Sequence, residues 1–235
     1  THMTPIQALS LPAILNQRVV IGQGKTGSGK TAAFGLGVLS NLNVKRFRVQ
    51  SLVLCPTREL ADQVAKEIRT LGRGIHNIKV LTLCGGMPMG PQIGSLEHGA
   101  HILVGTPGRI LDHLEKGRIN LEELNTLVLD EADRMLEMGF QDALDAIIDA
   151  APKQRQTLLF SATFPEKIEQ IAQRIMQSPE MIKVESTHDT SSIAQYFYNV
   201  EGSEARDEAL ANLLLTHQPE SAVVFCNTKK EVQNV

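Results

Sequence analysis

The chain has 235 residues, of which 42% are hydrophobic and 21% are charged. This apolar share is enough to build a buried core, and it excludes an intrinsically disordered segment. Because 23 Lys and Arg residues are set against 26 Asp and Glu residues, the formal net charge is −3. A domain that binds nucleic acid through bulk positive charge is therefore excluded, and any such contact must depend on particular residues.

Short apolar runs alternate with helical patterns from residue 18 to about 185. The predicted strands are residues 19–21, 51–55, 80–83, 102–104, 127–129, 157–160 and 181–184, and the predicted helices between them include residues 60–71, 109–116 and 142–150. Near-continuous apolar strands separated by helices indicate a parallel sheet covered on both faces. We therefore expect an α/β fold that binds ligands at the carboxyl ends of its strands.

The composition changes at Ser186, where residues 186–192 are small and polar, as in a linker. A strand-like run at 193–200, a helical pattern at 204–217 and a strand-like run at 222–226 follow. We interpret residues 1–185 as one complete domain and residues 193–235 as the start of a second one, since about 45 residues rarely form a core alone.

The three cysteines are widely spaced and form no CxxC pair, which disfavours both a disulfide framework and a zinc site. We expect Cys55, Cys84 and Cys226 to be buried, reduced thiols. Since neither a signal peptide nor an apolar run long enough for a bilayer is found, a soluble, cytoplasmic protein with no membrane partner is expected.

A phosphate-binding loop is predicted at residues 24–31, GKTGSGKT, which fit the pattern G-x-x-x-x-G-K-[ST]. The loop follows a strand at residues 18–23 and opens a helical pattern at 32–42, which is the setting that the motif requires. Its backbone would wrap a phosphate, with Lys30 on the β- and γ-phosphates and Thr31 on Mg²⁺. The predicted nucleotide contacts are Thr26, Gly27, Ser28, Gly29, Lys30 and Thr31. A plain Gly-Ser turn is the alternative.

The acidic tetrad at residues 130–133, DEAD, directly follows the apolar strand 127–129. An acid at a strand end facing a phosphate loop is where a further magnesium contact is expected. Asp130 would bind that ion, and Glu131 would orient or deprotonate the attacking water, so Lys30, Asp130 and Glu131 are the predicted catalytic residues. The alternative is an acidic helix N-terminus, which the helix dipole favours by itself.

An ordered set of eight short segments resembles the DEAD-box ATP-dependent RNA helicases over the whole length. They are residues 4–7, TPIQ; the phosphate loop; 56–61, PTRELA; 85–86, GG; 106–109, TPGR; the DEAD tetrad; 161–163, SAT; and 224–228, VFCNT. The resemblance implies a RecA-like domain with a mostly parallel sheet, followed by part of a second one. Residues 54–69 and 83–86 look most like a bacterial type linked to ribosomal RNA and ribosome assembly.

The resemblance also assigns roles to residues. Gln7 would read the adenine edge, and Asp133, Ser161 and Thr163 would couple the nucleotide state to RNA binding through hydrogen bonds. Single-stranded RNA backbone would be bound by Pro56, Thr57, Arg58, Glu59, Gly86, Thr106, Gly108 and Arg109. Guanidinium groups suit phosphate oxygens, although each arginine alone would also fit a surface charge. Val19 and Gly24 depart from the aspartate and alanine that are common in the family.

The expected activity is RNA-stimulated hydrolysis of ATP with Mg²⁺, coupled to local unwinding of RNA duplexes by a monomer. The family's arginine fingers belong to the second domain, so the isolated chain is expected to bind nucleotide but to hydrolyse it very slowly. Two alternatives stay open. One is another phosphate-loop enzyme, such as a kinase or a DNA translocase, and the other is a non-enzymatic fragment that clamps RNA or protein.

Overall fold

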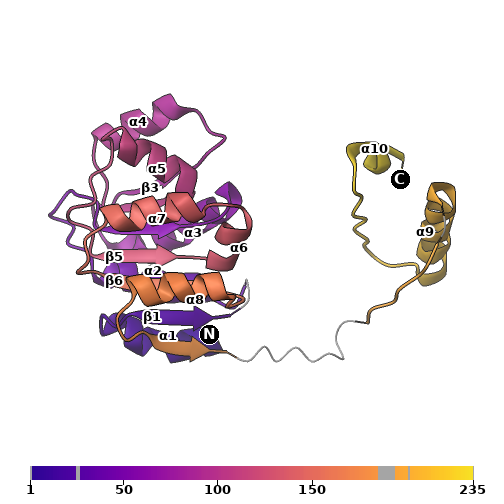
Figure 1. Ribbon diagram of the computed structural model, residues 1–235, viewed down its shortest axis with the longest axis horizontal. Helices are drawn as coiled ribbons and strands as arrows, with labels where there is room; N and C mark the ends of the chain where they lie inside the picture. The colour runs from indigo at the N-terminus through magenta and orange to yellow at the C-terminus, as the bar shows by residue number, and fades with distance from the viewer. Residues whose placement is uncertain (1, 25–26, 185–193, 201, 235) are drawn as a thin grey trace. The chain divides into compact units, whose positions relative to one another are not determined.

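The structure is a computed structural model that describes residues 2–24, 27–184, 194–200 and 202–234 (Figure 1). The chain divides into two compact units, Thr1–Ser186 and Thr187–Val235. We describe each unit by itself. No helix in the described part of the chain is both long enough and apolar enough to cross a membrane.

A parallel sheet forms the centre of the first unit. Within the described residues it has seven strands in the order β3-β4-β2-β5-β6-β1-β7, and every pairing between them is parallel. The strands are β1 Val20–Gln23, β2 Ser51–Leu54, β3 Val80–Leu83, β4 Ile102–Gly105, β5 Thr126–Leu129, β6 Gln156–Ser161 and β7 Glu180–Lys183. The seven predicted strands are therefore confirmed, with ends shifted by one or two residues.

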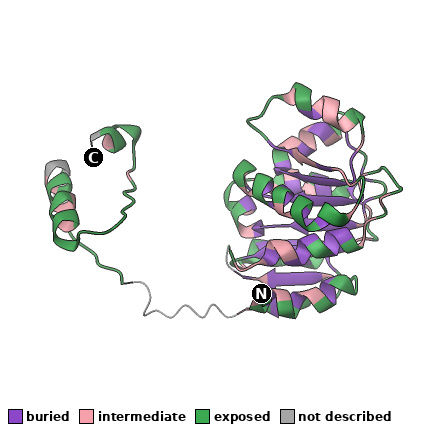
Figure 2. Cartoon of the chain, turned by 180° about the vertical axis from the view of Figure 1, so that it is seen from behind, coloured by how far each residue is buried: buried purple, intermediate pink, exposed green. Residues whose placement is uncertain are grey.

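Helices cover both faces of this sheet. They are α1 Pro5–Leu15, α2 Lys30–Ser40, α3 Arg58–Leu71, α4 Met89–Glu97, α5 Pro107–Glu115, α6 Ala132–Glu137, α7 Gln141–Ala150 and α8 Glu166–Ile175, with a 3₁₀ turn η1 at Gly72–Gly74. Figure 2 shows most of the sheet buried beneath helices whose outer faces are exposed, although three of the four residues of the edge strand β7 are exposed. The α/β fold predicted from the alternation of apolar runs and helical patterns is confirmed.

Two apolar clusters lie on opposite faces of the sheet because successive side chains of a strand alternate. In the inner strand β2, Leu52 and Leu54 belong to the cluster that packs under α5–α8. Val53 and the following Cys55 belong to the cluster that packs under α1–α3. Because both faces of the inner strands are buried, these strands appear in the sequence as nearly continuous apolar runs. Cys55 and Cys84 are buried thiols as expected, whereas Cys226 is partly exposed.

The second unit contains α9 Ser203–His217 and α10 Lys229–Asn234 among its described residues. The strands predicted at 193–200 and 222–226 are wrong, since the described residues of both runs are irregular. Phe197 and Phe225 are 91% and 93% exposed. A strand is stabilised by its neighbours, and the described part of this unit contains no strand to pair with, so the apolar pattern alone does not produce one.

Candidate functional site

The phosphate loop connects the end of β1 to the start of α2, as the sequence predicts. Gly27 and Gly29 have φ angles of 81° and 91°, a region that glycine adopts without the steric cost of a side chain. The loop enters the site beside β6, because the Gly24 amide donates to the Ser161 carbonyl at 3.2 Å. Thr26, also predicted in this loop, lies outside the described residues.

Gln7 in the first turn of α1 lies against the phosphate loop. Its Nε2 donates to the Gly29 carbonyl at 3.1 Å, and its Oε1 accepts from the Thr4 amide at 3.0 Å. A Cβ atom built on Gly29 would lie 2.6 Å from Gln7 Nε2, so the close approach depends on glycine. The structure thus places Gln7 as a support of the loop, while its contact with adenine stays a prediction.

Lys30 and Asp130 form a buried ion pair where the loop meets β5. The distance from Lys30 Nζ to Asp130 Oδ1 is 3.4 Å, and the side chains are 5% and 2% exposed. Burial raises the pKa of the Asp130 carboxyl; the Lys30 ammonium opposes that rise, and Glu131 adds to it. A further cation beside Asp130 would stabilise its ionised form.

Unsatisfied polar atoms show what this part of the site fits. Ser28 Oγ, Lys30 Nζ and Asp130 Oδ1 are buried and complete no hydrogen bond within the described residues. An amine and a hydroxyl are donors for phosphate oxygens, and a carboxylate is a ligand for Mg²⁺. In the described part of the chain no group of three or more His, Cys, Asp and Glu side chains could hold a metal. The residues therefore fit a magnesium ion bound mainly through phosphates and water.

Glu131 lies at the turn from β5 into α6, with φ 53° and ψ 52°. This left-handed backbone is unfavourable for a residue with a side chain and is found mostly where function or packing demands it. The residue is 7% exposed, and its Oε2 lies 3.8 Å from Arg134 Nη1. The turn places Glu131 next to the Lys30–Asp130 pair, as a residue that orients water would need to be.

Asp133 is bound to the segment that follows β6. Its Oδ2 accepts from the Thr163 amide at 2.9 Å and from Thr163 Oγ1 at 2.8 Å. Ser161 Oγ accepts from the Asp133 amide at 3.1 Å, and its side chain also contributes to lowering the pKa of the Asp133 carboxyl. Burial alone would raise the pKa of Asp133, but these hydrogen bonds, with one from the Arg134 amide, lower it overall.

A second group of predicted residues gathers at the carboxyl ends of β2, β3 and β4, which are neighbours in the sheet. Arg109 Nη1 donates to the Met87 carbonyl at 3.0 Å, and Arg58 Nη1 lies 3.4 Å from Met87 Sδ. Thr106 Oγ1 accepts from the Gly85 amide at 3.1 Å. The two arginines therefore flank one exposed loop, residues 85–88, which follows β3.

The other predicted RNA-binding residues differ in exposure. Thr57 caps α3, where its Oγ1 accepts from the Leu60 amide at 3.3 Å. Glu59, Gly86 and Gly108 are exposed, whereas Pro56 is buried. The Pro56 side chain therefore has little surface with which to bind a ligand, and its place at the strand end is structural.

The family comparison bears on one of the open alternatives. A protein-family model described as "DEAD/DEAH box helicase" matches residues 4–171, which is most of the chain. The chain belongs to this family. Its resemblance to the DEAD-box helicases is confirmed. The phosphate loop is therefore not that of a small-molecule kinase.

Relatives within the helicase family agree with this assignment. The chain is 58% identical over 233 residues to the ATP-dependent RNA helicase DbpA of Escherichia coli, covering 99% of this chain and 51% of that protein. It is 45% identical to the DEAD-box helicase CshA of Geobacillus kaustophilus, covering 99% and 50%. DbpA is the bacterial type that the sequence resembles. The chain spans about half the length of these curated relatives.

Solved structures of DEAD-box proteins have the same fold. A DEAD box protein from Methanococcus jannaschii is 40% identical with a TM-score of 0.73, covering 98% of this chain and 62% of that one. Dbp5 of Saccharomyces cerevisiae, solved with ADP and two protein partners, is 29% identical with a TM-score of 0.71, covering 100% and 61%. The predicted RecA-like architecture of this helicase domain is confirmed.

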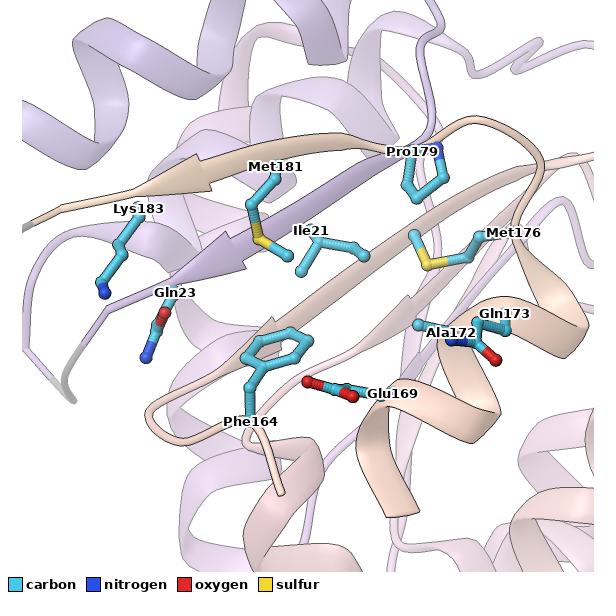
Figure 3. A pocket seen from close by; sticks show the side chains of 10 residues that line it. All are labelled: Ile21, Gln23, Phe164, Glu169, Ala172, Gln173, Met176, Pro179, Met181 and Lys183. Atoms are coloured by element: carbon cyan, nitrogen blue, oxygen red, sulfur yellow. The ribbon is translucent and has the colours of Figure 1, made fainter. Parts of the chain in front are cut away.

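A cavity of about 570 Å³ lies beside the phosphate loop of the helicase domain, between α8 and the strands β1 and β7 (Figure 3). Phe164, which directly follows Thr163, and Gln23, which directly precedes Gly24, both line it. Gln23 Nε2 also donates to the Ala162 carbonyl at 3.3 Å. Because apolar side chains such as Ile21 and Met181 form most of its wall, the cavity does not suit a triphosphate.

The motifs did not identify three residues that hold the site of this helicase domain together. Met87 is contacted by both Arg58 and Arg109. Gln92 and His113 form a buried hydrogen bond with each other. Neither Met87 nor Gln92 lies in a recognised motif. The spacing of Thr106, Arg109 and His113, which places them on one face of a helix, is the signal that could have indicated His113.

Proposed function

We propose that this chain is the nucleotide- and RNA-binding half of an ATP-dependent RNA helicase core. The observation that carries the proposal is that two groups of residues lie at the carboxyl ends of the strands. We call them the nucleotide group, which contains Lys30 and Asp130, and the arginine group, which contains Arg58 and Arg109. Lys30 and Asp130, with their unsatisfied buried atoms, lie at the ends of β1 and β5. Arg58 and Arg109 lie at the ends of β2 and β4, and β2 pairs with β5.

The nucleotide group would bind ATP with Mg²⁺. Lys30 would contact the β- and γ-phosphates, and Thr31 and Asp130 would hold the ion, which neutralises charge on the transferred phosphoryl group. Glu131 would orient the attacking water or accept its proton. Gln7 would contact adenine with the amide hydrogen that the Gly29 carbonyl leaves available.

The arginine group would bind the sugar–phosphate backbone of single-stranded RNA. Arg58 and Arg109 offer planar forks of donors that match phosphate oxygens, and the exposed Gly85 and Gly86 allow a strand to approach closely. Backbone contacts carry little sequence information. Selection of a particular RNA, for which we propose ribosomal RNA in ribosome assembly because of the similarity to DbpA, would therefore depend on another part of the protein.

Coupling between the groups would run through the acidic tetrad. Asp130 and Asp133 are three residues apart at the turn from β5 into α6, so movement at the nucleotide would be passed to Asp133, which binds Thr163. In the adjacent strand, Thr57 and Arg58 follow the end of β2. The sheet thus provides a short rigid connection between the two groups.

The test compares this chain with a version extended through the second domain. We expect the chain to bind a fluorescent ADP analogue and single-stranded RNA, with ATP hydrolysis raised by RNA only in the extended protein. RNA-stimulated turnover by residues 1–235 alone, at the rate of the extended protein, would contradict the proposal. Stimulation by DNA equal to that by RNA would favour a DNA translocase.

The remaining proposals concern the cellular setting. We propose a monomer that works in the cytoplasm, on the basis of the composition and the bacterial relatives. Sedimentation of the purified chain across a range of concentrations tests the first point, and fractionation of cells tests the second. Binding to ribosomal RNA fragments that is no tighter for the whole protein than binding to unrelated RNA of equal length would contradict the proposed target.

A further inference from the structure

Three residues at the start and along α5 lie on the side of the exposed loop 85–88. Thr106 occupies the N-cap position, and Arg109 and His113 follow at spacings of three and four residues, which places them on one face. Thr106 Oγ1 accepts from the Gly85 amide at 3.1 Å, and Arg109 Nη1 donates to the Met87 carbonyl at 3.0 Å. His113, one turn further along, is 0% exposed.

His113 reaches the same loop through Gln92 of α4. His113 Nε2 lies 2.9 Å from Gln92 Oε1, and Gln92 Nε2 donates to the Cys84 carbonyl at 3.0 Å. A carbonyl can only accept, so the amide nitrogen of Gln92 must face Cys84 and its oxygen must face His113. His113 Nε2 is therefore the protonated nitrogen and the donor in this chain of hydrogen bonds.

The surroundings of His113 favour the neutral ring. Its Nδ1 is buried and has no hydrogen-bond partner within the described residues, so a second proton there would be unsatisfied. Burial is the main cause that lowers the pKa of His113, and the positive charges of Arg118 and Arg109 lower it further. Asp112 acts in the opposite direction and Lys116 in the same one.

We propose that Gln92 and His113 are positioning residues for RNA binding, which fix the loop 85–88 from inside the domain. The proposal rests on the proposed RNA-binding function. Cys84 is the last buried residue before the loop, and Gly86 has a φ angle of 74°, a region that glycine enters without steric cost. The two other anchors are Thr106, which accepts from the Gly85 amide, and Arg109, which donates to the Met87 carbonyl.

The buried anchor should be the more effective one. Hydrogen bonds are stronger in a low-dielectric interior, and an unpaired buried partner is costly. Loss of the His113 donor leaves Gln92 Oε1 unsatisfied and allows its amide to turn away from Cys84. The loop would then sample positions in which Arg109 and the glycines no longer match the spacing of phosphates. RNA binding should weaken although no RNA contact has been removed.

The experiment compares His113→Leu with the control His101→Leu. His101 is also 0% exposed and fully hydrogen-bonded, to the Lys79 amide at 3.0 Å and the Val44 carbonyl at 3.1 Å. It directly precedes β4 and therefore lies at the amino end of that strand, whereas the predicted RNA-binding residues lie at the carboxyl ends. For each protein the dissociation constants for a fluorescent single-stranded oligouridine and a fluorescent ADP analogue are measured, together with urea unfolding.

We expect His113→Leu to weaken RNA binding by roughly tenfold, the effect of losing one buried hydrogen bond, with ADP affinity changed less than twofold. His101→Leu should lower stability while leaving RNA affinity unchanged. Equal RNA affinity of His113→Leu and the wild type, or an equal loss in His101→Leu, would overturn the positioning role. A wild-type chain that binds no RNA would instead overturn the proposed function.

A second variant, Gln92→Glu, decides the matter if His113→Leu does not fold. A carboxylate at 92 can accept from His113 but cannot donate to the Cys84 carbonyl, whereas its protonated form can do both. RNA affinity relative to wild type should therefore be low at neutral pH and should recover as the pH falls through the pKa of the new carboxyl. A ratio that does not change with pH would contradict the positioning role.

Discussion

Gly29→Ala tests whether Gln7 supports the phosphate loop. The φ angle of Gly29 is 91°, and a Cβ atom there would lie 2.6 Å from Gln7 Nε2 and 2.8 Å from Thr4 Oγ1. Gly27 provides the matched control, because its φ angle is 81° but a Cβ atom would meet nothing within 4 Å. Both substitutions force alanine into the left-handed region, and only one of them displaces Gln7.

The expected magnitudes follow from these contacts. The left-handed backbone costs about 1–2 kcal/mol for a residue with a Cβ atom, and this term is common to both variants. In Gly29→Ala the amide of Gln7 must also move, which breaks its bonds to the Gly29 carbonyl and the Thr4 amide. Two hydrogen bonds at about 0.5–1.5 kcal/mol each give an additional loss of about 1–3 kcal/mol.

Urea unfolding of the two variants measures the difference in the free energy of unfolding, provided that both keep the wild-type m-value. Titration with a fluorescent ADP analogue should show a larger loss of affinity for Gly29→Ala, because Gln7 no longer holds the loop in its binding conformation. If Gly27→Ala and Gly29→Ala lose the same stability and the same affinity, Gln7 does not support the loop.

Three further predictions concern charged and hydrogen-bonded groups of the site. Lys30→Met should lower ADP affinity at least tenfold in the fluorescence titration, since it removes the cation nearest the predicted phosphates; unchanged affinity would contradict the assignment. Thr163→Val should lower the free energy of unfolding by about 0.5–1.5 kcal/mol above pH 5. Because the pKa of Asp133 is lowered, its stabilisation is present above its unfolded value of 3.8 and is lost as the pH falls through the folded pKa. The loss on acidification should therefore be smaller in the variant than in wild type. The pKa of His113 is also lowered, so unfolding takes up a proton below its unfolded value of 6.5. Stability should decrease from that pH downward in wild type, and this decrease should shrink in His113→Leu.

The fold of the first unit could be predicted because its sheet is buried on both faces. The inner strands then carry apolar side chains at most positions, and β2 and β5 are buried throughout. The ends were less predictable, since polar residues there are held by distant groups. Gln156 begins β6 with its Nε2 on the carbonyls of Ile14 and Arg18, contacts that no local pattern encodes. In the second unit the apolar runs needed neighbouring strands that the described residues do not provide.

The sequence predicted which residues gather at the candidate site, but not the hydrogen bonds between them. Motif spacing placed Lys30, Asp130 and the arginines at strand ends, because each motif follows a strand and opens a helix. It did not indicate that Gln7 contacts Gly29 or that Gln92 links Cys84 to His113. These contacts join elements that are far apart in sequence, and their residue types are common. Only the folded arrangement of neighbouring strands brings them together.

Ser161 forms hydrogen bonds both with the phosphate loop and with the acidic tetrad. Its carbonyl accepts from the Gly24 amide at the entry to the phosphate loop, and its Oγ accepts from the Asp133 amide at the start of α6. β6 lies between β1 and β5 in the sheet, so a shift of Gly24 relative to β6 would strain its hydrogen bond to Ser161. Close-packed interiors respond to such strain by moving between discrete arrangements. We therefore propose that such a domain would transmit the state of a bound nucleotide to the exposed Thr163 and, through the adjacent β2, to Arg58.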